Sequence, residues 1–105
     1  MTVYIDPPDW PGAGRLWSHL VSDVSFDELH DFAVGIGCPR RAFDRDHYDV
    51  PGTRYAAAVS AGAVEVGSKE LLRRLTDAGL RRPRRRGPPR GSRERGRDGA
   101  GPAAG

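Results

Sequence analysis

The stretch Ser22-Asp23-Val24-Ser25-Phe26-Asp27-Glu28 decides the fold, because it marks where a strand ends and a helix begins. Ser25 followed three residues later by Glu28 is a capping box, in which the two residues satisfy backbone N–H groups at the helix start. The apolar pattern of residues 15–21 fits either a helix or a strand. A new helix starting at Ser25 favours a strand there, and the apolar spacing extends this helix to Ile36.

The other elements follow on both sides of this junction. Short β-prone runs bounded by Pro, Gly or Asp predict strands, and apolar residues at helical spacing predict two further helices. We expect strands at 2–6, 15–21, 47–50 and 63–66, and helices at 25–36, 51–62 and 68–79. Residues 9–14, rich in Pro and Gly, are expected to form a loop. The order β-β-α-β-α-β-α predicts an α/β fold with a three- or four-stranded, mainly parallel sheet, right-handed crossovers and three helices.

Charge divides the chain of 105 residues into two parts. Residues 1–80 carry 8 basic and 12 acidic side chains, a net charge of −4, whereas residues 81–105 carry 9 arginines and 2 acids, a net charge of +7. The second part has no aliphatic side chain larger than alanine, so we expect a domain at 1–80 and a disordered Arg/Gly/Pro-rich tail at 81–105. A core of this size points to a homodimer as one way to gain stability.

The sequence predicts a cytoplasmic protein with no membrane partner. It contains neither a signal-peptide pattern nor an apolar run long enough to cross a bilayer. Cys38 is the single cysteine, which excludes an internal disulfide and a zinc site of several thiolates from one chain. We expect Cys38 to fill a small apolar gap.

A polar cluster in residues 43–51 is the candidate site, because it combines an imidazole, a phenol and three carboxylates. Ligands of open α/β sheets gather outside the carboxyl ends of strands. We therefore predict a divalent metal bound by Asp6, His19 and Asp23, with His47 and Asp49 as catalytic residues. The donor set leaves zinc, iron or nickel and magnesium or manganese as alternatives.

The chemistry that such a centre supports is activation of water against a phosphate-containing substrate. Arg41, Arg45 and Tyr48 are the candidate substrate-binding residues, since guanidinium groups bind phosphate through paired hydrogen bonds. The alternative is structural: the arginines neutralise neighbouring acids, Asp49 caps the next helix, and Asp46 forms an exposed bridge. His30 lies on an apolar helix face, where a hydrogen-bonded histidine at the core boundary is expected.

The arginine-rich segment suggests a second function. Arg84, Arg85 and Arg86 are candidate nucleic-acid-binding residues that would contact phosphates without reading the base sequence. On this alternative the chain is a non-enzymatic adaptor or a nucleic-acid-associated protein. A third interpretation is that the bias toward Arg, Gly, Pro and Ala reflects GC-rich coding.

Four short motifs together carry a family resemblance. They are Gly14-Arg15-Leu16-Trp17-Ser18-His19-Leu20, Glu28-Leu29-His30, His47-Tyr48-Asp49 and Gly62-Ala63-Val64-Glu65-Val66. In these residues the chain resembles a family of short bacterial and phage proteins known as domain of unknown function 4031, over roughly residues 1–80. The resemblance implies no activity, and it implies that the segment from Arg81 onward is an appendage to the domain. Many members have a longer insert where this chain passes directly from Phe43 to His47.

Overall fold

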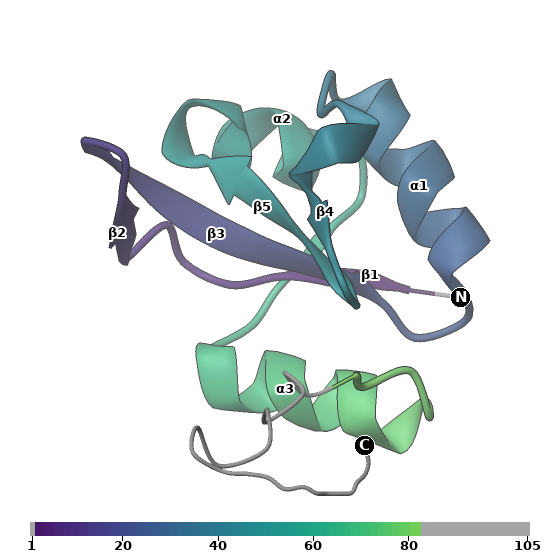
Figure 1. Cartoon of the computed structure of the whole chain (residues 1–105). Helices are drawn as coiled ribbons and strands as arrows, with labels where there is room; N and C mark the ends of the chain where they lie inside the picture. Colours follow the sequence, from purple (N-terminus) through teal and green to yellow (C-terminus); the bar gives the residue numbers. More distant parts are fainter. Residues whose placement is uncertain (1, 83–105) are drawn as a thin grey trace, which may run out of the picture.

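The computed structural model describes residues 2–82. Its strands there are β1 Val3–Ile5, β2 Trp10–Gly12, β3 Arg15–Ser22, β4 Phe43–Asp44, β5 His47–Pro51 and β6 Val64–Glu65. Its helices are α1 Phe26–Gly35, α2 Tyr55–Ser60 and α3 Ser68–Asp77, with 3₁₀ turns η1 Arg40–Ala42 and η2 Gly52–Arg54. The sheet lies between two helical layers, with α1 and α2 on one face and α3 on the other (Figure 1).

The sheet is mixed. Its strands lie in the order β4-β5-β3-β1-β6, and β2 pairs with the first three residues of β3. Among these pairs only β1–β6 is parallel, and the other four are antiparallel. The α/β class and the three helices are therefore confirmed, whereas the prediction of a three- or four-stranded, mainly parallel sheet is wrong.

The physical reason for this error is a hairpin between β4 and β5. Asp44 pairs with His47, so only two residues connect the strands, and β5 lies between β4 and β3. Because β5 is antiparallel to both neighbours, β4 runs in the same direction as β3, as a crossover through α1 requires. The hairpin therefore places the antiparallel strand β5 between β3 and β4.

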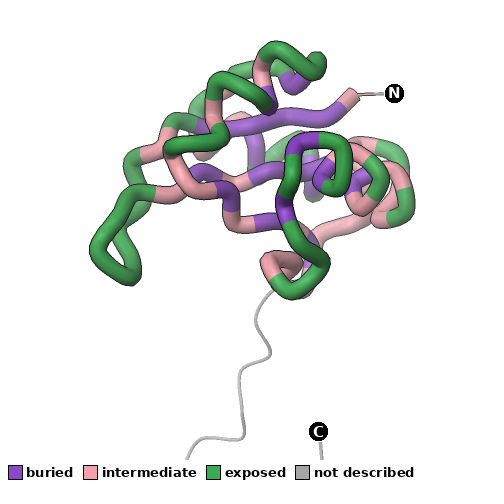
Figure 2. The backbone as a smooth tube through the Cα atoms, turned by 90° about the horizontal axis from the view of Figure 1, so that it is seen from above, coloured by how far each residue is buried: buried purple, intermediate pink, exposed green. Residues whose placement is uncertain are grey.

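A second hairpin occupies most of the predicted loop at 9–14. β2 pairs with β3 from Trp10 opposite Trp17 to Gly12 opposite Arg15. The two connecting residues, Ala13 and Gly14, have φ angles of 49° and 76°, as tight two-residue hairpin turns require. This arm is exposed over 9–16 (Figure 2).

The predicted helix at 51–62 is shorter than expected. Pro51 is the last residue of β5, a 3₁₀ turn follows, and α2 begins only at Tyr55. Because proline lacks a backbone N–H, it fits the end of a strand as well as a first helical turn.

Side-chain alternation along the strands separates two apolar clusters. Ile5, Leu20 and Tyr48 are fully buried on the face covered by α1 and α2. Tyr4 and Val21, one position away, pack against α3. Cys38 is buried in the first cluster, as predicted. Because side chains alternate along a strand, His19, His47 and Asp49 share the face that carries Val21, beneath α3.

The junction at Ser22–Glu28 is built as a relay rather than a simple capping box. The Ser25 hydroxyl accepts a hydrogen bond from the Glu28 N–H at 3.1 Å, which confirms the helix start. The Glu28 carboxylate accepts from the Ser22 hydroxyl at 2.5 Å, and that hydroxyl accepts from the N–H groups of Val24 and Ser25. Strand end and helix start are therefore fixed together.

The described chain ends on the domain surface. Arg81 and Arg82, predicted to begin a disordered tail, are held by the buried Asp46. The rest of that prediction, with Arg84, Arg85 and Arg86, lies outside the described residues. Among the helices of residues 2–82, none has the length and apolar character to cross a bilayer.

The helix cap can be tested by Ser25→Ala. Removing the hydroxyl leaves the Glu28 N–H without its acceptor, so we expect a loss of about 1 kcal/mol in the free energy of unfolding. Urea denaturation followed by circular dichroism measures it. Ser60→Ala, at an exposed position at the end of α2, is the matched control and should change stability by less than about 0.5 kcal/mol.

Candidate metal centre

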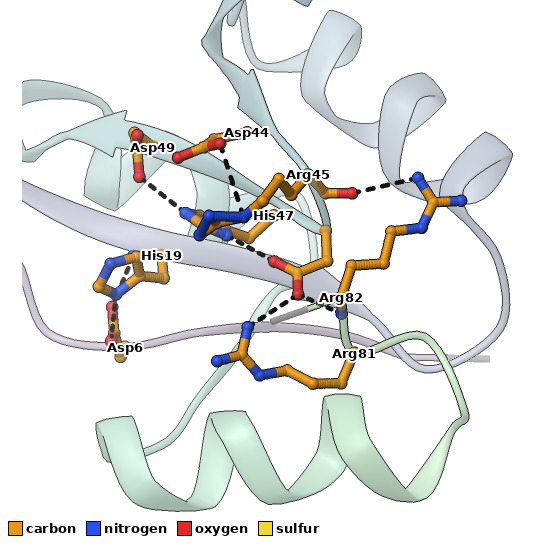
Figure 3. Close-up of polar contacts among 9 residues, drawn as sticks. Asp6, His19, Asp44, Arg45, His47, Asp49, Arg81 and Arg82 are labelled. Carbon is orange, nitrogen blue, oxygen red and sulfur yellow. Dashed lines mark hydrogen bonds and ion pairs between the residues drawn. The ribbon is translucent and has the colours of Figure 1, made fainter. Parts of the chain in front are cut away.

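Two histidines and one aspartate meet on the sheet face beneath α3. His19 on β3 pairs directly with Asp49 on β5, and His47 lies two residues before Asp49 on the same side of that strand. One ligand atom from each of the three residues lies within 4.8 Å of the others. The imidazole ring centres are 5.1 Å apart (Figure 3). The pairing of neighbouring strands therefore brings together residues that are far apart in the sequence.

Asp6 holds the first histidine in place. Its fully buried carboxylate accepts from the His19 backbone N–H at 2.6 Å and is 2.9 Å from His19 Nδ1. It also accepts from the Trp10 indole N–H at 3.2 Å and from the Ser68 hydroxyl at 2.8 Å. Burial alone would raise the pKa of Asp6, but the hydrogen bonds from His19 and Ser68 outweigh it and lower that pKa. Asp6 is thus an ionised acceptor whose donors come from three elements.

Asp46 plays the same part for the second histidine. Its carboxylate is 1% exposed and lies 2.8 Å from His47 Nδ1. It also accepts from the Arg81 guanidinium at 3.0 Å and from the Arg82 backbone N–H at 2.7 Å. These bonds outweigh burial and lower the pKa of Asp46. The exposed bridge considered for Asp46 is therefore wrong, because Arg81 and Arg82 cover it.

The second nitrogen of His47 faces Asp49. His47 Nε2 is 3.2 Å from Asp49 Oδ1. Burial lowers the pKa of His47, but the hydrogen bonds to Asp49 and Asp46 outweigh it and raise that pKa. A cation that bound Nε2 of His47 would replace the proton on that nitrogen, since metal-ligating imidazoles are neutral.

Not all predicted site residues reach this face. Asp23 lies at the end of β3, where its carboxylate accepts from the Thr2 N–H at 2.8 Å and from the Tyr4 hydroxyl at 3.4 Å. Tyr48 points to the opposite face of the sheet and is fully buried, with its hydroxyl 2.7 Å from His30 Nδ1. Its place between His47 and Asp49 explains this, because adjacent side chains on a strand point to opposite faces. The pair also gives His30 the hydrogen bond expected of it.

The predicted arginines lie on two sides of the cluster. Arg45 lines a cavity of about 400 Å³ between the sheet and α3, together with Trp10, His19, His47 and Arg81. Arg41 lines a second cavity of about 380 Å³ that Asp49 shares with Trp17 and Arg54. The three candidate ligands therefore stand between two open spaces.

Arg45 also has an unusual backbone. It is the first residue of the β4–β5 turn, with a φ of 62°, where glycine or asparagine is ordinary. Such a conformation costs of order 1–3 kcal/mol and is common at functional sites. Ser68 and Arg81 contact the two buried carboxylates, but no sequence pattern indicates these roles. The serine that opens α3 resembles an ordinary cap, and Arg81 resembles the rest of the arginine segment.

Fold and site define a small three-layer α/β domain that carries a two-histidine, one-aspartate cluster on a cleft. A family model described as "Protein of unknown function (DUF4031)" matches residues 3–78, and the chain belongs to this family. This confirms the resemblance, while a bacterial or phage origin stays a prediction. No curated protein and no solved structure is significantly similar to the chain. The match ends before Arg81 and Arg82, which nevertheless contact Asp46.

The role of Asp6 can be tested by Asp6→Asn. The amide group presents a donor to the four donors that surround it, so we expect the free energy of unfolding to fall by about 3 kcal/mol or more. Urea denaturation followed by tryptophan fluorescence measures the change. Asp9→Asn, at an exposed position on the same loop, is the matched control. Equal stability of both variants would show that the Asp6 carboxylate does not hold the fold.

Proposed function

We propose that this chain is a divalent-metal-dependent hydrolase of phosphate-containing substrates, with His19, His47 and Asp49 as the metal ligands. The observation that carries the proposal is the convergence of these three side chains within 4.8 Å, with a buried carboxylate behind each imidazole. This assignment keeps the predicted ligand His19 and moves Asp6 to a supporting role. His47 and Asp49, predicted as catalytic residues, become ligands.

The carboxylate behind each ring is the strongest support. Metal-ligating histidines usually donate their second ring N–H to a carboxylate or carbonyl, which fixes the tautomer and the ring orientation. The Asp6 carboxylate is hydrogen-bonded to Nδ1 of His19, and the Asp46 carboxylate to Nδ1 of His47. The Nε2 atoms are left for the cation, and Asp49 is the third ligand. Metal–ligand distances are about 2.0–2.2 Å. To reach them, the three ligand atoms would have to move about an ångström closer to one another.

Three protein ligands leave coordination positions open for water and substrate. Two histidines with one carboxylate suit zinc or iron(II), and this donor set disfavours magnesium. Such a cation lowers the pKa of water and neutralises the phosphate charge. In the reaction, a water oxygen forms the new bond to phosphorus and the bond from phosphorus to the leaving oxygen breaks. The attacking water gives one proton to solvent, and the leaving oxygen takes one up.

The arginines beside the centre support a phosphate-containing substrate. Arg45 opens onto the cavity that His19 and His47 line, and Arg41 onto the cavity that Asp49 lines. A guanidinium on either side can hold phosphate oxygens while the cation polarises a third phosphate oxygen.

The alternative function is a non-enzymatic, nucleic-acid-associated adaptor. The arginine-rich segment supports this alternative, and a purified chain that retains no cation would favour it.

Metal binding tests the proposal directly. The purified full chain, incubated with zinc or, without oxygen, with iron(II) and then dialysed, should retain about one ion per chain in elemental analysis, as a mononuclear site of three protein ligands predicts. His47→Ala and Asp49→Ala should lose the ion. Asp23→Ala, which removes a carboxylate just after the strand of His19 and away from the cluster, should keep it. Equal metal content in Asp49→Ala and Asp23→Ala would exclude this ligand set.

Hydrolysis tests the second half of the proposal. With the ion bound, the chain should release nitrophenolate from bis(p-nitrophenyl) phosphate, and EDTA should abolish this release. Arg45→Gln should lower the rate by about 10- to 100-fold with the metal content unchanged, because it removes one charged contact to the phosphate. A chain that holds the ion but hydrolyses no phosphate ester would contradict the proposed activity.

A further inference from the structure

We infer that the cavity between α3 and the sheet binds a nucleoside monophosphate, whose base stacks on Trp10 and whose phosphate lies against Arg45 beside the cluster. The inference rests on the proposed function and names its substrate class. It depends on three observations: an exposed aromatic ring that lines the cavity, cationic side chains that line it too, and the strand order that sets the ring apart from the cluster.

The exposed indole of Trp10 is the first observation. Trp10 lines the cavity from β2 and remains 45% exposed, and the Asp6 carboxylate fixes its position by accepting from the indole N–H. Leu72, which is 44% exposed, lines the same cavity from α3. Ligand pockets combine such apolar walls with a few polar groups, and planar rings stack on an indole face. The two side chains therefore suit a flat heteroaromatic base.

The charged groups that line the cavity favour an anion. They are three cationic side chains and two carboxylates, namely Arg45, Lys69, Arg81, Asp6 and Asp46. Both carboxylates are buried and hydrogen-bonded, whereas Lys69 is exposed and the two arginines are only partly buried. The charges that a ligand in the cavity meets are therefore mainly positive.

Arg45 has donors to spare for a phosphate. Its Nε is buried and has no hydrogen-bond partner among residues 2–82, and the Asp44 carboxylate oxygen at 3.9 Å is too far away to accept. The guanidinium therefore keeps its charge without a close carboxylate. Its terminal N–H groups can bind two phosphate oxygens at once, in the paired geometry that arginine favours.

Strand order sets the distance between base and phosphate. Trp10 on β2 and His47 on β5 lie on opposite sides of β3, which carries His19. The ring centre of His19 is 5.0 Å from that of Trp10 and 5.1 Å from that of His47. A ligand that stacks on the indole and brings its phosphate to the cluster therefore needs a spacer. The pentose of a nucleotide provides one, whereas a ring bonded directly to the phosphate does not.

Hydrolysis of this substrate releases a nucleoside and inorganic phosphate. A water oxygen forms the new bond to phosphorus, and the bond from phosphorus to the ribose oxygen breaks. The ribose oxygen takes up a proton, and the attacking water gives one to solvent. The cavity of about 400 Å³ lies within the usual size range of sites that enclose a small ligand.

Isothermal titration calorimetry of the full chain in EDTA tests the inference without the metal. Adenosine monophosphate (AMP) should bind about 5- to 150-fold more tightly than ribose 5-phosphate, the gain expected from one stacked base. Trp10→Leu should remove this difference and leave the affinity for ribose 5-phosphate unchanged. Trp10→Phe, which loses the same indole N–H but keeps an aromatic ring, should retain the difference.

A second pair of variants tests the phosphate end. Arg45→Gln should weaken binding of both AMP and ribose 5-phosphate by about 10-fold, because it removes a charged hydrogen-bond donor. Arg73→Gln, the same change of charge at an exposed position of α3 that does not line the cavity, should leave both affinities unchanged.

The outcomes distinguish this inference from the proposed function. Equal affinities for AMP and ribose 5-phosphate, or equal AMP binding by Trp10→Phe and Trp10→Leu, would overturn the inference, because the base would then not stack on the indole. Unchanged binding in Arg45→Gln would overturn it as well. The hydrolase proposal survives the first two results, since metal content and nitrophenolate release are measured separately. Conversely, a chain that retains no ion but binds AMP in this way would lose the hydrolase and keep the nucleotide site.

Discussion

The fully buried carboxylate of Asp6 is the constraint on which this structure depends. A charge without water is costly unless donors surround it, and here the donors come from β2, β3 and the first residue of α3. The hydrogen bonds to the Asp6 carboxylate therefore fix the exposed hairpin, the central strand and the only helix on that face in the described chain. The same carboxylate orients His19. The fold and the candidate site therefore share this interaction.

Local features of the chain were predictable because their causes are local. The cap at Ser25, the strand over residues 15–21 and the strand predicted at 63–66 each depend on a few neighbouring residues. Each is present in the structure. The direction of β5 was not predictable in this way. It depends on a two-residue turn in which Arg45 adopts a φ of 62°, and arginine does not indicate such a turn. Once that turn was missed, alternation of strands and helices suggested parallel neighbours.

The candidate site was predictable in composition but not in arrangement. Asp6, His19, His47 and Asp49 were all identified from their residue types and their positions at strands, and the structure places them on one face. Their division into proposed ligands and a supporting carboxylate rests on strand register, which pairs His19 with Asp49 rather than with Asp6 or Asp23. Alternation within His47-Tyr48-Asp49 also separates Tyr48 from its neighbours. It turns the phenol into a core residue that hydrogen-bonds His30.

The two faces of the sheet explain why the cleft lies where it does. Beneath α1 and α2, strand residues such as Ile5, Leu20 and Val50 form an apolar layer, and the buried phenol within it, Tyr48, is paired with His30. Beneath α3, the buried apolar cluster consists of Tyr4, Val21, Leu71 and Leu75, and Asp6, His19, Asp46 and His47 line the cavity beside it. The cavity between α3 and the sheet lies where these polar groups replace apolar contacts. Asp46 then uses Arg81 and Arg82 to neutralise its own charge at the rim of that space. The donors that satisfy the buried Asp46 therefore include two residues beyond the family match, and Asp46 links Arg81 and Arg82 to His47.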